Sequence, residues 1–273
     1  MTADSAVIYI PHGGGPLPLL GHTGHDAMNA FLKNIGKTLP RPRAVVVVSA
    51  HWEMDIPVVT SHSAPELIYD YHGFPRETYE IRYPAPGHPE LAAKAVDLLT
   101  QARIKAKTNE KRGFDHGVFI PLILMLPQAD IPCIQISLCA SLDPLEHLRV
   151  GEALAPLLEE NIWLLGSGFS FHNMRGFDMG PGPGAGTDPD PDNQAFQDWL
   201  KDTCANGRQT PEQQKENLIH WDHAPGAWHC HPRQEHLLPL MVCAGAAGYA
   251  PAKTVFDGII MGRRALGFLW QDA

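Results

Sequence analysis

The run Ala44–Val48 is the feature of the sequence that most restricts the fold. Its residues are one alanine followed by four valines, so the run is uncharged, mostly β-branched and free of polar-apolar alternation. Alternation is expected when one face of a strand meets solvent, and its absence indicates a strand covered on both faces. The run therefore predicts a central strand of a sheet that carries helices on each side.

Other short apolar runs that end at Gly or Pro alternate along the chain with segments of helical spacing. Strands are predicted at 6–10, 44–48, 56–60, 131–138, 162–165 and 253–258, and helices at 26–37, 89–101, 117–125, 144–159, 193–204, 211–219 and 235–245. This alternation predicts an α/β fold: an open, largely parallel mixed sheet covered by helices on both faces. We expect one catalytic domain that spans residues 1–273.

Two stretches fit neither pattern. Residues 61–88 are irregular and rich in Pro, Gly and Tyr, and residues 178–193 consist mainly of Gly, Pro and Asp. Connections of this length in a compact domain usually serve function. We therefore expect Tyr69–Gly87 and Asp178–Asn193 to border a substrate pocket, the second as a mobile loop.

The composition argues against several classes of partner. The formal net charge is −9 and no run is rich in Lys or Arg, which argues against nucleic acid. No window approaches 18 consecutive apolar residues and the N-terminus lacks a basic-then-apolar leader, which argues against a membrane partner and secretion. The five cysteines form no C-x-x-C pair, as expected for reduced thiols of a cytoplasmic protein. A homo-oligomer remains open.

The clearest functional signal comes from a subset of the 15 histidines in the chain. Several follow a predicted strand or open a predicted helix, where the ligands of an open α/β sheet bind. Neutral imidazole is the commonest protein ligand for first-row metals, so a convergence of these groups predicts a mononuclear metal site and an enzyme. The residues concerned are His12, His51, His116, His172 and His236.

Simpler explanations stand beside this hypothesis. His12 could be a turn residue among glycines, and His51 a hydrogen-bonded core histidine. Asp115 could cap the helix that His116 begins, which would also fix where that imidazole points. Glu235 and His236 would point about 100° apart on a helix, so at most one of them should face a metal squarely. We expect surface positions for His22, His25, His62, His88, His147, His220 and His223, and intermediate roles for His72, His229 and His231.

The donor set leaves the metal open. Three nitrogen ligands, or two with a carboxylate, suit a non-haem Fe(II) that activates oxygen. The same donors suit a catalytic Zn²⁺ that carries a bound water. The spacing of the histidines does not separate these two metals.

Taken together and in order, the motifs resemble those of the class III extradiol ring-cleavage dioxygenases, and within them the 4,5-DOPA-dioxygenase-like subgroup. The resemblance runs through nearly the whole chain. It rests on residues 39–42, 45–52, 73–75, 83–87, 113–117, 131–132, 168–173 and 235–240.

The resemblance implies cleavage of a catechol by O₂ to a ring-opened semialdehyde, with Fe(II) as cofactor and Zn possible in purified protein. It implies that His12, His51 and His236 bind the iron, with Glu235 as the alternative third ligand. It also implies that His172 is the catalytic acid/base and His116 a substrate-facing catalytic partner. Two departures are Gly13–Gly15, where relatives often carry a Gly-Ser pair, and the loop at 178–193.

Two other functions compete with the dioxygenase. A zinc-dependent hydrolase could use the same histidines, and would cleave an ester or amide without consuming O₂. A non-enzymatic interaction protein of the same fold would bind iron without turnover or would have a blocked crevice.

Overall fold

The computed structural model describes residues 4–178 and 189–271. Within them the chain forms one open sheet whose strands follow the order β4-β3-β5-β2-β6-β1-β8-β7. The central strands β5, β2, β6 and β1 run parallel, whereas β3 is antiparallel to β5, and β8 is antiparallel to both β1 and β7. The strands are β1 (Ala6–Pro11), β2 (Ala44–Met54), β3 (Val58–Thr60), β4 (Lys107–Asn109), β5 (Cys133–Cys139), β6 (Ile162–Gly168), β7 (Lys253–Ile260) and β8 (Arg263–Trp270).

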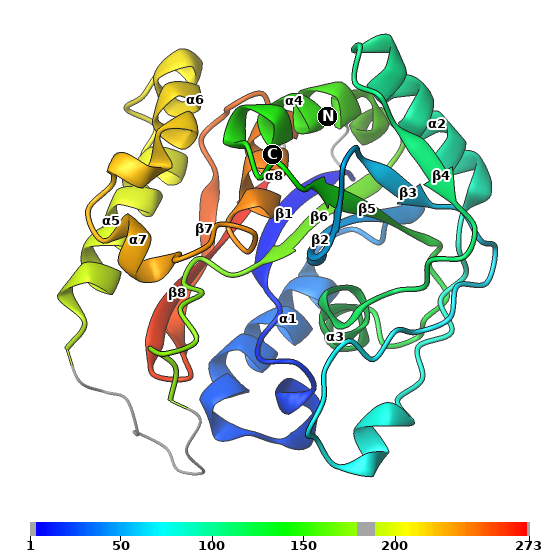
Figure 1. The fold of residues 1–273 in the computed structure, drawn as a ribbon, viewed down its shortest axis with the longest axis horizontal. Coiled ribbons are helices and arrows are strands. Elements are labelled where there is room, and N and C mark those ends of the chain that lie inside the picture. Colours follow the sequence, from blue (N-terminus) through cyan, green and yellow to red (C-terminus); the bar gives the residue numbers. More distant parts are fainter. Residues whose placement is uncertain (1–3, 179–188, 272–273) are drawn as a thin grey trace.

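Helices cover both faces of this sheet (Figure 1). Helices α1 and α3 pack together on one face, and α4 and α8 pack together on the other. The α-helices are α1 (Asp26–Thr38), α2 (Pro89–Gln101), α3 (His116–Met125), α4 (Pro144–Leu154), α5 (Pro191–Ala205), α6 (Pro211–Ile219), α7 (Ala227–Cys230) and α8 (Leu238–Ala246). Short 3₁₀ helices are η1 (Leu17–Leu20), η2 (Thr23–His25), η3 (Arg76–Tyr79), η4 (Ala155–Glu159) and η5 (Trp221–His223). The predicted single α/β domain is confirmed.

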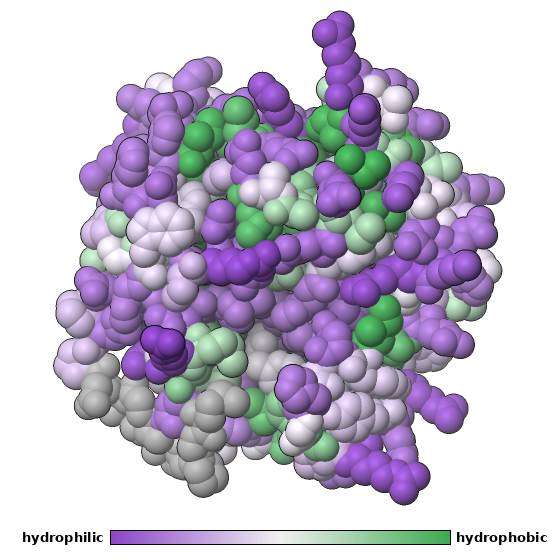
Figure 2. Space-filling view, in the orientation of Figure 1, coloured by the Kyte–Doolittle hydropathy of each residue, from purple (hydrophilic) through white to green (hydrophobic). Residues whose placement is uncertain are grey.

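The valine run of β2 is the centre of the core, as predicted. Val45, Val46 and Val47 are fully buried between β5 and β6, with α3 on one side and α8 on the other. The outer surface is different in character. On the face drawn in Figure 2, hydrophilic residues predominate and hydrophobic ones form small separate patches. Of the helices that the structure describes, none is long and apolar enough to cross a membrane.

The sheet contains a strand that the sequence pattern missed. The run 253–258 is not the last strand, because β8 follows β7 after a turn at Met261 and Gly262, both of which have positive φ. β8 begins with Arg263 and Arg264 and contains Gly267, so it lacks the continuous apolar pattern of a buried strand. It nevertheless lies between β1 and β7.

Gly166-Ser167-Gly168 lie beyond the strand predicted at 162–165, but these residues are the last three of β6. The glycines serve close packing. A Cβ on Gly166 would lie 2.6 Å from the carbonyl oxygen of Pro239, and one on Gly168 would lie 2.2 Å from that of His236. Any larger residue would therefore push away the chain at the start of α8.

Two predicted boundaries also move. The helix expected from residue 235 begins at Leu238, so Glu235 and His236 lie in the turn before α8. Helix α5 begins at Pro191, where Asp190 accepts a hydrogen bond from the backbone N–H of Asn193, and not at residue 193. The mobile loop predicted at 178–193 falls largely on residues 179–188, which lie outside the described residues.

Candidate metal and active site

His12 lies at the edge of the sheet where the neighbouring parallel strands β1 and β6 end. His12 directly follows β1, and its backbone N–H donates to the carbonyl oxygen of Gly168 at the end of β6, 3.2 Å away. The side chain is 1% exposed. It lies where ligands of open parallel sheets bind.

His51 lies inside β2, not beyond its end as the sequence had indicated. The ladder between β2 and β5 is interrupted there, because Val48 pairs with Ile136 while the next paired residue, Glu53, pairs with Leu138. Residues 49–52 therefore bulge away from the regular ladder. A bulge redirects side chains, and this one lets His51 approach His12 from the next strand but one.

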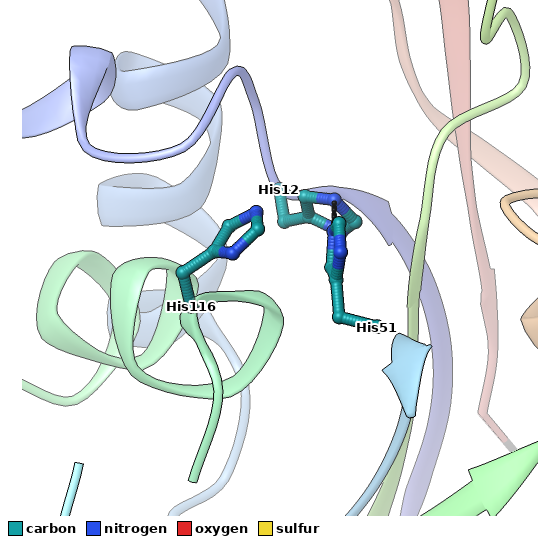
Figure 3. A group of neighbouring side chains, drawn as sticks. All are labelled: His12, His51 and His116. Carbon is teal, nitrogen blue, oxygen red and sulfur yellow. Dashed lines mark hydrogen bonds between the residues drawn. The ribbon is translucent and has the colours of Figure 1, made fainter. Parts of the chain in front are cut away.

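The ring nitrogens of three histidines converge. The Nε2 atoms of His12 and His51 are 2.9 Å apart (Figure 3), and the Nε2 atom of His236 lies 3.3 Å from that of His51. Two nitrogen donors bound to one first-row ion at about 2.1 Å and at right angles are about 3.0 Å apart. The observed separations therefore fit donors that share one ion.

Hydrogen bonds to the opposite ring nitrogens fix the tautomers of two of these imidazoles. Ser167 donates its hydroxyl to the carbonyl oxygen of Gly117, so towards Nδ1 of His12, 3.0 Å away, it can only accept. A carboxylate oxygen of Glu235 accepts from Nδ1 of His236 at 2.8 Å. Both Nε2 atoms are therefore unprotonated and direct lone pairs into the shared space.

The same three imidazoles are held in the neutral form. Burial, reinforced by the neighbouring histidines, lowers the pKa of His12, His51 and His236 well below the ordinary value. Neutral imidazole is the form that binds a metal ion, so the site requires no deprotonation at neutral pH.

Glu235 joins His236 to His172. Its Oε1 atom is 2.8 Å from Nδ1 of His236 and 3.2 Å from Nδ1 of His172, and the two rings stack with centroids 3.3 Å apart. Burial opposes ionisation of this carboxyl, but the hydrogen bond from His172, a backbone hydrogen bond and the charges of His172 and Arg233 together lower the pKa of Glu235. One carboxylate thus orients two histidines. The 100° separation predicted for Glu235 and His236 on a helix does not apply, because both residues lie in a turn.

His116 begins α3 and is held by a residue that the sequence did not single out. Asp70 accepts hydrogen bonds from the backbone N–H of His116 at 3.0 Å and from its Nδ1 at 2.8 Å. Burial opposes ionisation of Asp70, but the hydrogen bonds from His116 and the charges of His116 and His51 together lower its pKa. Asp115 occupies the N-cap position of α3, as the simpler explanation expected, but its side chain makes no capping hydrogen bond.

Asp115 is instead a buried acceptor behind the site. It accepts from the hydroxyl of Ser49 at 2.7 Å, from the amide of Gln135, and from Arg112 at 3.1 Å. Burial, with repulsion from Asp70, raises its pKa. These contacts tie the bulged end of β2 to the start of α3.

The histidines open into a pocket of about 210 Å³. Its lining comes from several separate segments of the chain. They contribute His12, Gly13, Gly14, Gly15, His51, Tyr71, Phe74, His116, Phe169, His172, Met174, Phe177, His236 and Met261. Tyr71 and Phe74 belong to the stretch Tyr69–Gly87 that we expected beside the pocket.

The remaining histidines do not line this pocket. The expected surface position is wrong for His25 and His147, which are 0% and 1% exposed. Each accepts a backbone N–H within the core, from Gly14 and Cys139 respectively. His231 is also buried, and its Nε2 donates to the carbonyl oxygen of Ser170. His62, His220 and His223 are exposed, as predicted.

Comparison with known proteins agrees with this architecture. Residues 7–260 match the family model described as the catalytic LigB subunit of aromatic ring-opening dioxygenase. A protein named dioxygenase tasH from Hapsidospora irregularis is 43% identical over 257 residues, 88% of this chain and 78% of that protein. One named 4,5-DOPA dioxygenase extradiol from Beta vulgaris is 38% identical over 243 residues, 88% of this chain and 86% of that protein.

A crystal structure of an uncharacterized protein from Escherichia coli K12 has the same fold, with a TM-score of 0.77 and 32% identity. The match covers 97% of this chain and 98% of that one. The family match, the relatives and the fold lead to one conclusion. The chain belongs to the LigB family of class III extradiol ring-opening dioxygenases.

Proposed function

We propose that the protein is an Fe(II)-dependent extradiol dioxygenase that opens the ring of a catechol with O₂ and yields a semialdehyde acid. Both oxygen atoms of O₂ enter the product. The observation that carries this proposal is the convergence of the Nε2 atoms of His12, His51 and His236 at a pocket that also holds His116 and His172. A metal site with two further proton carriers beside it suits a substrate that must lose protons.

We assign His12, His51 and His236 as the metal ligands. The donor set is all nitrogen, the tautomers of His12 and His236 are fixed, and each ring is neutral. His116 forms a second grouping with His12 and His51, and Asp70 holds its Nδ1 as Glu235 holds that of His236. We assign His236 because its Nε2 lies 3.3 Å from that of His51. Glu235 is placed behind His236 on the Nδ1 side, the position of a carboxylate that orients a metal-binding imidazole.

Ferrous iron on these ligands would hold the two catechol oxygens and O₂ side by side and pass charge between them. The same nitrogens also fit zinc, which would support a hydrolase. Reconstitution with each metal distinguishes these two possibilities. The rest of the chemistry belongs to side chains of this chain.

His172 is assigned as the acid/base. Its Nδ1 is engaged by Glu235, which leaves Nε2 to accept a proton from a catechol hydroxyl. The carboxylate stabilises the imidazolium that results, and the proton can return when the ring opens. The stacked ring of His236 keeps His172 in one orientation.

His116 is assigned as the second substrate-facing group. Asp70 fixes its Nδ1, so Nε2 is the atom that can donate to or accept from a bound ligand. Its ring centroid is 3.9 Å from that of His51 and 5.5 Å from that of His12, so it lies beside the metal ligands. A donor at this place can stabilise negative charge that develops on the substrate.

The deciding experiment is anaerobic reconstitution of the metal-free protein with Fe(II), followed by oxygen-electrode measurements with a panel of catechols. We expect O₂ uptake equimolar with a ring-opened product that absorbs in the visible range. A parallel sample loaded with Zn²⁺ is the control and should consume no O₂. Ester or amide hydrolysis by the zinc form, without O₂ uptake by the iron form, would favour the hydrolase. Stoichiometric iron with no turnover would favour a non-enzymatic role.

A further inference from the structure

The far wall of the pocket is apolar. Beyond the histidines it is formed by aromatic and thioether side chains together with the backbone of Gly13–Gly15. The rings of Tyr71 and Phe74 are 5.5 Å apart, with Tyr71 beside His116, and those of Phe169 and Phe177 are 5.3 Å apart, with Phe177 beside His172. The hydroxyl of Tyr71 donates to the carbonyl oxygen of Thr78 at 2.6 Å, so it is already satisfied there.

A substrate carboxylate would find no cation in this lining. Among the described residues, no lysine or arginine lines the pocket. Residues 179–188, which the structure does not describe, contain none in their sequence. The charged groups directly behind the lining are instead the carboxylates of Asp70 and Glu235.

Two arginines behind the lining are already held by carboxylates, and Arg175, beside the lining residue Met174, is exposed to solvent. Arg112 pairs with Asp115 at 3.1 Å, and Arg233 makes two bonds of 2.6 Å to Glu53. A carboxylate that enters the pocket would therefore have to be desolvated without a partner, which is strongly unfavourable.

We propose that the pocket selects catechols whose ring substituent is uncharged and apolar, and discriminates against substituents that carry a carboxylate. This inference rests on the proposed ring cleavage and defines its substrate class. The catechol oxygens lie at the histidine end, so the substituent extends between the two aromatic walls. Met174 and Met261 let the lining adapt to arms of different shape, because unbranched thioethers repack easily.

The test compares 3-(3,4-dihydroxyphenyl)propanoate with its methyl ester, which lacks the charge and carries one extra methyl group, and uses L-DOPA as a zwitterionic probe. The methyl group alone accounts for about 0.8 kcal/mol, roughly fourfold in affinity. Dissociation constants are measured by anaerobic calorimetry on Fe(II)-loaded protein, so the readout is binding and not turnover. We expect the ester to bind at least about tenfold more tightly than the acid. The chain is acidic overall, so the ratio is measured at about 50 and 500 mM salt to screen long-range repulsion.

Substitutions in the wall separate charge from shape. Phe74→Lys and Phe74→Leu both remove the ring, but only the first adds a cation. Phe74→Lys should remove the preference for the ester, and Phe74→Leu should retain it. Arg175 is exposed and follows the lining residue Met174. Arg175→Gln should leave the ester-to-acid ratio unchanged.

The outcomes are distinguishable. If catechols bind and consume O₂ but the acid binds as well as the ester, the selectivity is wrong and the ring-cleavage proposal stands. If Arg175→Gln abolishes tight binding of the acid, Arg175 is a carboxylate receptor and the inference is overturned. If neither ligand binds and no catechol supports O₂ uptake, the proposed function fails and the inference fails with it.

Discussion

Asp70 and His116 are 46 residues apart in the chain, yet one carboxylate oxygen of Asp70 holds both the backbone N–H and the ring Nδ1 of His116. The same contact caps the first turn of α3 and sets the direction of an imidazole in the pocket. A stability role and an orienting role therefore coincide in a single side chain, and substitutions can separate them.

Asp70→Ala should lower both the stability and the turnover. Loss of the acceptor at the start of α3 should cost about 1 kcal/mol of unfolding free energy. A free His116 ring should cost about tenfold to a hundredfold in kcat. Asp70→Asn is the matched control: its carbonyl oxygen can accept from both the backbone N–H and Nδ1 of His116, so urea melts should be near wild type. Its kcat should fall less than that of Asp70→Ala, because only the negative charge is lost. Wild-type kcat in both variants would refute the orienting role.

The ligand assignment predicts which histidines hold the metal. His12→Ala, His51→Ala and His236→Ala should each abolish stoichiometric iron binding, measured by a chelator assay after anaerobic loading, with native far-UV circular dichroism. His116→Ala should retain iron. Loss of iron in His116→Ala with retention in His236→Ala would exchange the roles of these two residues.

The third ligand also has an internal control. Glu235→Ala should weaken iron binding by about tenfold to a hundredfold, because His236 loses the group that orients it. If instead Glu235→Ala loses iron completely and His236→Ala keeps it, Glu235 is the ligand.

His172→Ala should separate binding from chemistry. Iron content and anaerobic catechol binding should be near wild type, while kcat falls by about a hundredfold, the usual scale for a lost general base. Oxygen-electrode rates and calorimetry on the same preparation provide the two readouts. A kcat within a few-fold of wild type would remove His172 from the mechanism.

The glycines of β6 predict a metal effect from a residue that binds no metal. Gly168→Ala would place a Cβ 2.2 Å from the carbonyl oxygen of His236, whereas Gly166→Ala would place one 2.6 Å from that of Pro239. Both should lower the melting temperature. At a temperature where both remain folded, only Gly168→Ala should lose iron affinity strongly. Equal iron affinities would show that His236 tolerates the displacement.

Acid should destabilise the metal-free protein. Burial, reinforced by His22, lowers the pKa of His25 to about 4, and burial also lowers the pKa of His147. Below about pH 6.5 the unfolded chain takes up protons that the folded chain refuses, so stability falls as the pH drops towards 4. Each such histidine contributes a slope of at most about 1.4 kcal/mol per pH unit.

Urea midpoints at pH 7, 6 and 5 measure this slope. His25→Gln keeps an acceptor for the N–H of Gly14 but cannot titrate, so its slope should be shallower than that of the wild type. Parallel slopes for the two proteins would assign the acid sensitivity to other groups.

Much of the fold follows from local pattern. The residues of Val45–Val48 alone predict a strand covered on both faces, whatever surrounds them in the fold. The alternating apolar and helical runs on either side predict the α/β class. β8 could not be predicted in the same way. Its first residues are arginines, of which Arg264 is neutralised by Asp198 and Asp257, and those partners are visible only in three dimensions.

The site divides along the same line. His12 and His172 were recognisable because glycines and strand ends mark their surroundings in sequence. Asp70 was not, since its function depends on a contact across 46 positions. His25 and His147 looked like surface residues because nothing local shows that a backbone N–H will meet their rings. The long-range hydrogen bonds of the site cannot be predicted from the local pattern of apolar and polar residues.

The position of β8 between β1 and β7 has a consequence for biosynthesis. Strand β1 emerges first from the ribosome, but its partner on one side is completed only with residue 270. Until then β1 presents an unpaired edge, a template for pairing with other chains. The nascent protein therefore carries an aggregation-prone edge until β8 has been made, and chaperone demand should fall sharply once residues 263–270 can dock.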